Sequence, residues 1–235
     1  MRADTPRIPQ PPRIPAQLAA ITGGSLAVER ALSGTLLTGD YSGQTINDLD
    51  VDGSRIAEVR FTGTTLNRLR LTDVLVENAD LSGADLDGSA FTRVEFRDCR
   101  MSGAAFTGCS FRDVLATGCR LDEANLAMSE AGSVVFDGVD LRNSVFYAAK
   151  LEGTRFFDCN LTGAQFSQAS TPGVRFHGSV LVDLRGAQFL AGAVIDSTQV
   201  LPVALGVLSA HRIEVNDERE PSVPPKGKGP RSSSH

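Results

Sequence analysis

A five-residue period in the apolar side chains constrains this sequence more than any other feature. Ten of the twelve phenylalanines lie at positions that differ by multiples of five. The column that they define runs over thirty positions from Leu36 to Leu181, and twenty-six of these are Leu, Phe, Ile, Val or Met. The exceptions are Tyr41, Ala116, Ala131 and Thr171. A period of five matches neither a helix, which repeats every 3.6 residues, nor a strand, which repeats every two.

Two further columns keep the same period. The position two residues before each apolar centre holds Gly, Ala, Ser, Thr, Cys or Val at twenty-seven of thirty places, and the position two residues after it is Gly at thirteen. A chain that bends between periods can point one large and one small side chain inward, and glycine tolerates such bends. One unit cannot bury its apolar side chain alone, whereas a stack of units forms a continuous interior. The sequence therefore predicts a solenoid.

The repeated units resemble those of a known family. Residues 79–88 read Ala-Asp-Leu-Ser-Gly followed by Ala-Asp-Leu-Asp-Gly, and residues 124–126 read Ala-Asn-Leu. They resemble the A-(D/N)-L-x-x signature of the pentapeptide-repeat proteins, over about 160 of 235 residues. The resemblance implies an all-β solenoid, a right-handed quadrilateral β-helix with four pentapeptides in each of about eight coils. Because no insertion breaks the phase before Leu181, the chain is most similar to the loop-free mycobacterial and actinobacterial fluoroquinolone-resistance type.

The period also divides the chain into segments. We expect a Pro-rich arm (1–20), an N-terminal cap (21–35), the β-helix (36–196), a C-terminal capping and dimerisation helix (197–215) and a disordered tail (216–235). The arm, with Arg-Ile-Pro at residues 7–9 and 13–15, is either a disordered tail or an extended segment packed on the rod or on a partner. A short helix is expected within residues 16–33. The phase shifts after Leu181, which predicts an irregular corner near residues 182–185 and centres at Leu184, Phe189 and Val194.

The C-terminal helix has more apolar surface than a lid alone requires. Ser197 or Thr198 can cap it, which leaves Pro202 near the first turn, where a missing N–H matters least. A last coil exposes apolar centres and backbone groups, so it needs a cover. The family resemblance implies that such caps join two rods end to end as a homodimer, and the candidate contacts are Val200, Leu201, Val203, Leu205, Val207 and Leu208.

Residues twenty apart are expected to stack in the interior. One face then carries a core ladder of Phe96, Phe136, Phe156 and Phe176, interrupted at Ala116. Ala131 lies on the neighbouring face, and we expect larger neighbours to fill the space beside both alanines rather than to leave a cavity. Phe157 points outward by phase and is a candidate contact residue.

Metal, cofactor and catalytic sites are not expected. Residues 48–53 match the opening of an EF-hand loop, but Val59 stands where the bidentate glutamate should be. The four cysteines lie in the inward small column at spacings of ten, ten and forty, so we interpret them as core residues. No nucleophile, Walker or dinucleotide-binding motif is present, so we expect no enzyme.

Charge and hydropathy leave two functions open. The chain has 23 basic and 28 acidic residues, and this acidity argues against direct nucleic-acid binding. No apolar run or leader suggests a membrane or export, which predicts a cytoplasmic protein. The first function is a protein-interaction scaffold with an unknown partner. The alternative, implied by the resemblance, is a DNA-mimicking modulator or protector of DNA gyrase or topoisomerase IV. Its candidate acidic surface is Asp48, Asp50, Asp52, Glu58, Asp80, Asp85 and Asp87.

Overall fold

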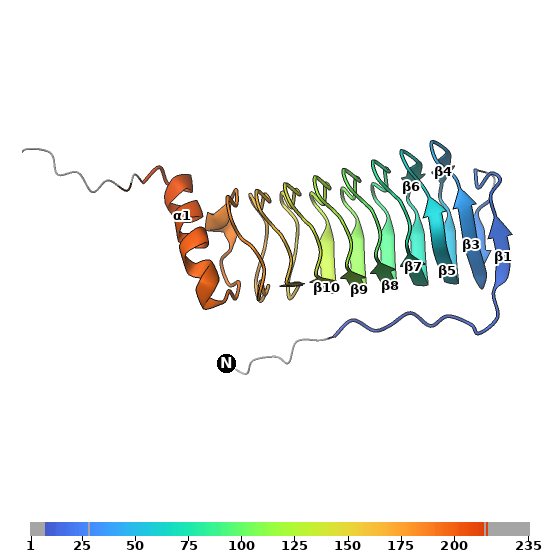
Figure 1. Ribbon diagram of the computed structural model, residues 1–235, viewed down its shortest axis with the longest axis horizontal. Helices are drawn as coiled ribbons and strands as arrows, with labels where there is room; N and C mark the ends of the chain where they lie inside the picture. The colour runs from blue at the N-terminus through green and yellow to red at the C-terminus, as the bar shows by residue number, and fades with distance from the viewer. Residues whose placement is uncertain (1–7, 28, 214, 216–235) are drawn as a thin grey trace, which may run out of the picture.

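The chain winds into a rod of stacked coils closed at one end by a helix. Figure 1 shows the computed structural model, which describes residues 8–27, 29–213 and 215. Its strands are β1 (Ala19–Thr22), β2 (Ala31–Ser33), β3 (Thr35–Asp40), β4 (Thr45–Asn47), β5 (Asp50–Arg60), β6 (Thr65–Asn67), β7 (Arg70–Glu77), β8 (Ala90–Arg97), β9 (Ser110–Thr117), β10 (Glu130–Asp137) and β11 (Arg155–Phe157). Two short 3-10 helices (Ala187–Phe189 and Ser197–Gln199) and helix α1 (Val200–Ala210) follow.

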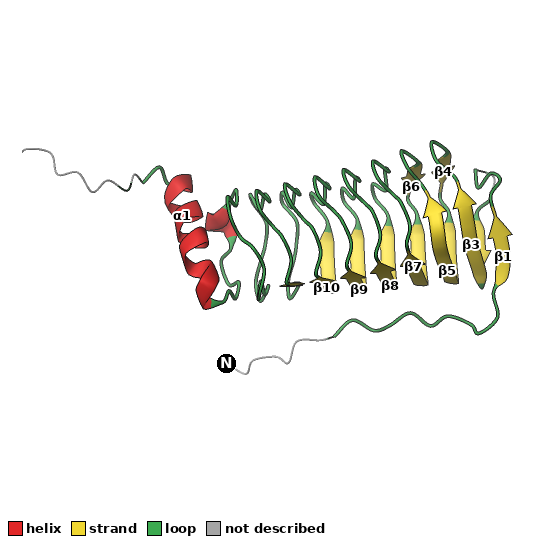
Figure 2. Cartoon of the chain, in the orientation of Figure 1, coloured by secondary structure: helices red, strands yellow, loops and turns green. Residues whose placement is uncertain are grey.

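All strand pairs are parallel, and from Gly39 to Arg185 successive coils are twenty residues apart. The earlier pairs are offset by sixteen or nineteen residues, so the buried centre of β3 is Leu37, which pairs with Ile56, and the prediction of Leu36 is wrong. The main sheet has the order β1-β3-β5-β7-β8-β9-β10-β11, with β2 beside β5, and β4 pairs with β6 (Figure 2). Leu71 pairs with Phe91, and Phe91 with Phe111, and the isolated bridges keep the same spacing as far as residue 185. We name the four faces after their centres in one coil: the Leu71, Val76, Leu81 and Leu86 faces. The predicted solenoid of four pentapeptides per coil is confirmed.

The bends between faces lie at the position two residues after each centre. Every residue of this column from Gly43 to Asp183 has a positive φ, whether or not it is glycine. A left-handed conformation costs an L-residue roughly 1–2 kcal/mol, so it accounts for the thirteen glycines in the column. Sixteen bends carry a side chain all the same, which shows that the stacked coils hold the backbone in this conformation.

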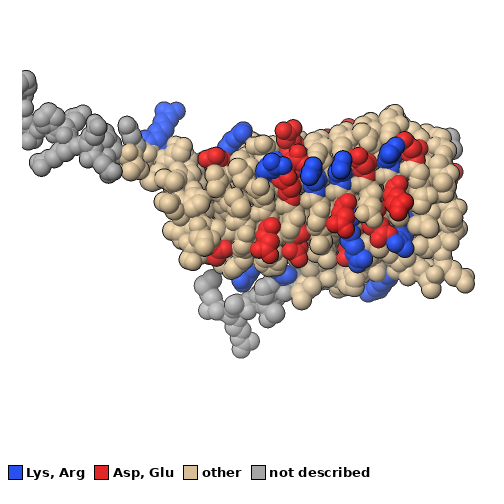
Figure 3. All heavy atoms as spheres, in the orientation of Figure 1, with Lys and Arg blue, Asp and Glu red and all other residues tan. Residues whose placement is uncertain are grey.

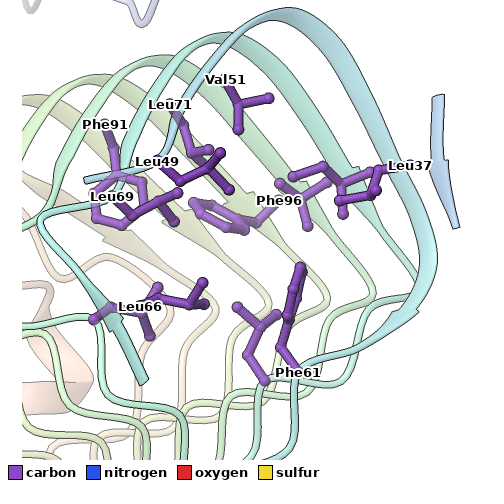
Figure 4. A pocket seen from close by; sticks show the side chains of 13 residues that line it. Leu37, Leu49, Val51, Phe61, Leu66, Leu69, Leu71, Phe91 and Phe96 are labelled. Atoms are coloured by element: carbon purple, nitrogen blue, oxygen red, sulfur yellow. The ribbon is translucent and has the colours of Figure 1, made fainter. Parts of the chain in front are cut away.

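Stacked rings fill the later coils. Phe156 stacks on Phe136 and on Phe176 with ring centroids 5.1 Å apart in each pair. Ala116 is buried and breaks the ladder as expected. Ala131 packs against the core and is only half-buried, and with Gly132 it borders an open depression of about 420 Å³ beside the outward side chains Thr92 and Arg112. In the early coils, where most centres are Leu, Val or Ile, a void of about 20 Å³ remains, lined only by apolar side chains (Figure 4).

The phase shift lies four residues later than the sequence suggested. Arg175 pairs with Val194, nineteen residues away, so one residue is missing from the last coil. Leu184 is buried, but because Arg185 still pairs with Gln165 it occupies the small column, equivalent to Ala164, and is not a centre. Phe189 and Val194 are 36% and 37% exposed, so all three predicted centres are wrong. Ile195 packs against the core instead. The chain tightens at Gly186 into the 3-10 helix 187–189, which takes up the missing residue.

The ends differ from expectation in two respects. In place of the helix expected within residues 16–33, the chain forms β1 and β2, which add to the first coils. At the other end the 3-10 helix 197–199 leads directly into α1, and its N-cap is Asp196 rather than Ser197 or Thr198. The Asp196 carboxylate accepts the Thr198 N–H at 2.9 Å, and the Gln199 side chain completes a capping box. Pro202 lies in the first turn of α1, as predicted. The tail 216–235 lies outside the described residues.

Two glycines of positive φ provide a matched pair of tests. A Cβ at Gly186 would lie 2.5 Å from the Ser167 backbone nitrogen, whereas a Cβ at Gly103 would meet nothing within 4 Å. We expect Gly103→Ala to lower the free energy of unfolding by about 1 kcal/mol through backbone strain alone. Gly186→Ala adds overpacking and should cost about 2–3 kcal/mol. Urea unfolding followed by circular dichroism measures both, and equal losses would contradict the tight corner at Gly186.

Candidate functional site

The seven acidic residues singled out in the sequence are spread over four faces. Asp50 and Asp52 lie on the Leu71 face, and Glu58 ends the Val76 face. Asp80 lies on the Leu81 face, and Asp48, Asp85 and Asp87 belong to the Leu86 face, with one coil between Asp48 and the other two. Asp48, Asp52 and Glu58 are exposed and the other four are half-buried. The coil register therefore does not bring these carboxylates together on one side of the rod.

Basic residues alternate with acidic ones along the rod. On the Leu81 face, residues twenty apart read Asp40, Arg60, Asp80, Arg100, Arg120 and Asp140. On two other columns Arg68 donates two hydrogen bonds to Asp48, at 2.6 and 2.8 Å, and Lys150 pairs with Glu130 at 2.5 Å. Figure 3 shows acidic and basic side chains interspersed on one side. The excess of acid is thus divided into short, partly neutralised stretches.

These pairs hold the acids in their charged form. Hydrogen bonding to Arg68 lowers the pKa of Asp48, and bonding to Arg142 lowers the pKa of Asp140. Exposed pairs of this kind contribute little to stability, so we expect their main effect to be on the surface potential. Pairs between neighbouring coils can be found in the sequence by comparing the signs of charge of residues twenty apart. A net charge summed over each face does not reveal them.

The bend between the Leu71 and Val76 faces carries a site that sequence reasoning missed. Its successive residues are Gly53, Asp73, Arg93 and Asp113, all with φ between 52° and 55°. Arg93 donates two hydrogen bonds to Asp73, both at 2.6 Å, and this pairing lowers the pKa of Asp73. Asp73 and Asp113 are only 9% and 4% exposed, although they lie at a bend of the outer wall. We call these four residues the edge column.

The N-terminal arm covers the edge column. Residues 8–18 run beside the coils from β1 toward the α1 end of the rod (Figure 1). Pro15 Cδ lies 3.3 Å from the place of a Cβ on Gly53, the Arg13 N–H donates to Asp73 at 3.0 Å, and the Gln10 N–H donates to Asp113 at 3.4 Å. The sequence left open whether the arm is disordered or packed as an extended segment. Residues 8–15 are packed on the rod.

Helix α1 covers the last coil and leaves apolar residues outside. Val203 and Val207 pack against the core, and Leu208 is half-buried. Val200, Leu201 and Leu205 are exposed. Leu201 and Leu205 also border an open groove of about 490 Å³ whose other wall includes Val182 and Leu184. The six candidate cap residues thus divide into an inward set and an outward set.

Phe157 lies outside the core, as its phase predicts. It is half-buried, and its ring meets that of His177 edge-on at 6.5 Å. Arg155 and Arg175 complete an open depression of about 510 Å³. Arg155 is buried, and this desolvation together with the charge of Arg175 lowers its pKa.

The four thiols are buried in the wall of the rod. Burial raises the pKa of Cys109 and of Cys159 to about 12, and hydrogen bonding with Cys119, followed by burial, raises that of Cys99. Hydrogen bonding with Cys99 lowers the pKa of Cys119. Cysteine binds metal and reacts as the thiolate, which the environments of Cys99, Cys109 and Cys159 disfavour. Within residues 8–27, 29–213 and 215, no three His, Cys, Asp or Glu residues are placed to share a metal ion. In the same ranges, no helix has the length and apolar character needed to span a bilayer.

Comparison with known proteins identifies the family. A model of the pentapeptide repeat region matches residues 89–166, and a model of eight pentapeptide repeats matches residues 159–189. No curated protein matches the chain. Among solved structures, full-length QnrB1, a plasmid-mediated fluoroquinolone resistance protein, aligns at 23% identity and a TM-score of 0.40, over 83% of this chain and 98% of that one.

HetL, a pentapeptide-repeat protein involved in heterocyst differentiation regulation in the cyanobacterium Nostoc, aligns at 19% identity and a TM-score of 0.28, over 74% of this chain and 92% of its own. The two family models together span residues 89–189. The same five-residue columns and twenty-residue coils extend on the N-terminal side as far as Gly43. The repeat region of the chain, residues 89–189, belongs to the pentapeptide-repeat family.

Proposed function

We propose that the chain is a non-enzymatic interaction scaffold whose working surfaces lie on the outside of the rod. The observation that supports this most strongly is the edge column, where the wall already holds an extended peptide, its own arm, through two buried carboxylates. The interior is occupied by the stacked centres, and the largest apolar surface lies at the α1 end. A rod of this kind presents long, stiff columns of side chains to a partner.

The alternative is a mimic of DNA that acts on gyrase or topoisomerase IV. Such a mimic needs acidic charge that continues along the rod, to meet the basic surface that binds DNA. The repeat body, residues 36–196, has 22 acidic and 14 basic residues, and arginines interrupt several of its columns, among them that of the Leu81 face. The column that holds Glu58, Asp98 and Asp158 has no basic residue. The alternation on the Leu81 face and the Asp48–Arg68 pair argue for the scaffold and against the mimic.

We further propose that two chains join through the α1 end. Val200, Leu201 and Leu205 form an apolar ridge beside the groove lined by Val182 and Leu184. Ridge and groove lie on the same surface, so a twofold axis would insert each ridge into the partner's groove. The exposed Val180 would extend this contact.

If two chains join in this way, carboxylates introduced into the ridge should lower the mass of the particle in solution. Leu201→Asp combined with Leu205→Asp should convert a species of twice 24.9 kDa into one of 24.9 kDa, because two carboxylates would be buried without partners. Ala210→Asp, at an exposed position of the same helix that does not border the groove, is the matched control and should leave the dimer intact. Light scattering over a range of concentrations measures the mass. A wild-type chain that is monomeric at every concentration would refute the dimer.

The scaffold is tested by capture with matched variants. The tagged full-length protein is cross-linked in extract from its own cells, and bound proteins are compared between the wild type and charge-reversed variants of single columns. We expect one captured protein to be lost when the charges of one particular column are reversed, and to be retained by the variants of the other columns. If every captured protein is retained by every variant, or if none is enriched over the tag alone, the scaffold function is wrong.

A further inference from the structure

The edge column and the arm fit each other in spacing. Pro15 lies on Gly53 and Gln10 on Asp113, so five residues of arm pass three coils. An extended polyproline II segment rises about 3.1 Å per residue, which gives roughly 15.5 Å. Three coils at about 4.8 Å each give roughly 14.4 Å. The length of an extended proline-rich segment therefore matches the height of the coils that it passes. A helix of the same number of residues, at about 1.5 Å per residue, would be too short.

The arm also fits in its hydrogen-bond donors. Residues 9, 11, 12 and 15 are proline and have no N–H. Of residues 8–15 only Ile8, Gln10, Arg13 and Ile14 keep a donor, and two of these four, Gln10 and Arg13, meet Asp113 and Asp73. A hydrogen bond from a backbone N–H to a charged carboxylate is stronger than one to a neutral acceptor, so the two positions favour a segment with an N–H at each of them. Arg93 fixes the orientation of Asp73 by a two-bond pairing, so this acceptor is in place before a segment binds.

We propose that the edge column is a recognition site for an extended, proline-rich segment, and that residues 8–15 are its intramolecular ligand. The arm occupies the site and competes with the same sequence offered by another molecule. This deepens the scaffold function, on which it rests, by naming the class of segment that the rod binds. Polyproline II segments suit such a role because they lose little conformational freedom on binding.

Competition between the arm and a free peptide tests the proposal in the full-length chain. The probe is a fluorescein-labelled peptide of residues 8–17, and the variant is Arg13→Pro, which removes the donor to Asp73 and keeps the arm extended. Fluorescence anisotropy should show the peptide binding the variant at least about tenfold more tightly than the wild type, because a tethered arm acts at an effective concentration of roughly millimolar. Circular dichroism and the melting temperature establish that the variant is folded.

Two controls separate the site from the rest of the rod. Adding Asp73→Asn and Asp113→Asn to the Arg13→Pro chain should weaken peptide binding about tenfold or more. The chain should tolerate both changes, because asparagine already occupies the same bend position on other faces, at residues 78 and 143. A peptide that itself carries proline in place of Arg13 should bind poorly to every chain. Equal affinity for the wild type and the Arg13→Pro chain, no binding to either, or binding that ignores the two aspartates would overturn the proposal. If the peptide fails while a column variant still loses a captured partner, the scaffold function stands without this site.

Discussion

Replacing Phe156 by alanine should lower the free energy of unfolding by about 3–5 kcal/mol. The ring is fully buried, stacks between Phe136 and Phe176 at 5.1 Å, and meets Phe146 edge-on at 5.7 Å. It also meets Phe166 edge-on at 6.4 Å, and alanine would remove all four ring contacts, each worth about 0.5–1.5 kcal/mol beyond the buried area. It would also open a cavity that stacked coils cannot easily close, because each coil is fixed by hydrogen bonds to its neighbours. Urea unfolding followed by circular dichroism measures the loss.

The neighbouring phenylalanine is the control for this substitution. Phe157 is chemically identical and adjacent, but it is half-buried and contacts only the His177 ring among the aromatic side chains. We expect Phe157→Ala to cost less than about 1 kcal/mol. A similar loss for the two variants would mean that the ring ladder does not stabilise the rod, and the assignment of the inward column would then fail.

The buried thiols predict a loss of stability at alkaline pH. An unfolded thiol loses its proton near pH 9, whereas Cys109 and Cys159 hold theirs in the folded chain to about pH 12. Between these values the folded state binds more protons, so its advantage is complete below pH 9 and declines as the pH rises toward 12. At pH 10.5 each thiol should have cost roughly 2 kcal/mol, or about 4 kcal/mol for the two. Urea unfolding at a series of pH values measures the decline.

Serine at both positions removes this titration and conserves the structure. Cys109 Sγ donates to the Leu86 carbonyl at 3.1 Å, and Ser89, at the same position one coil earlier, donates to the equivalent carbonyl of Leu66. Ser129, at the same position one coil later, donates to the Leu126 carbonyl of its own coil. The Cys109→Ser, Cys159→Ser chain should therefore fold, and its free energy of unfolding should fall by about 4 kcal/mol less than that of the wild type between pH 8 and 10.5. Parallel curves for the two chains would show that these thiols are not buried as described.

The five-residue period was sufficient to predict the coil, its inward columns and its bends, because one side chain per repeat must point inward in every coil. It failed where a residue is missing from the last coil: Phe189 is apolar and nearly in phase, yet the tight corner at Gly186 turns it outward. The pairing of Asp48 with Arg68 follows from signs of charge compared at a spacing of twenty. The edge column could not be found in this way, because it depends on contacts between Arg13 and Asp73, sixty residues apart, which no local pattern encodes.

The most direct test of the central claim, a charge-compensated scaffold rather than a mimic of DNA, is a gyrase supercoiling assay. The purified full-length chain is added up to tens of micromolar, with and without a quinolone. We predict unchanged supercoiling and no protection from the drug, because arginines divide several of the acidic columns along the rod. Inhibition or protection that rises with protein concentration, and that Asp48→Lys combined with Asp80→Lys abolishes, would contradict this account.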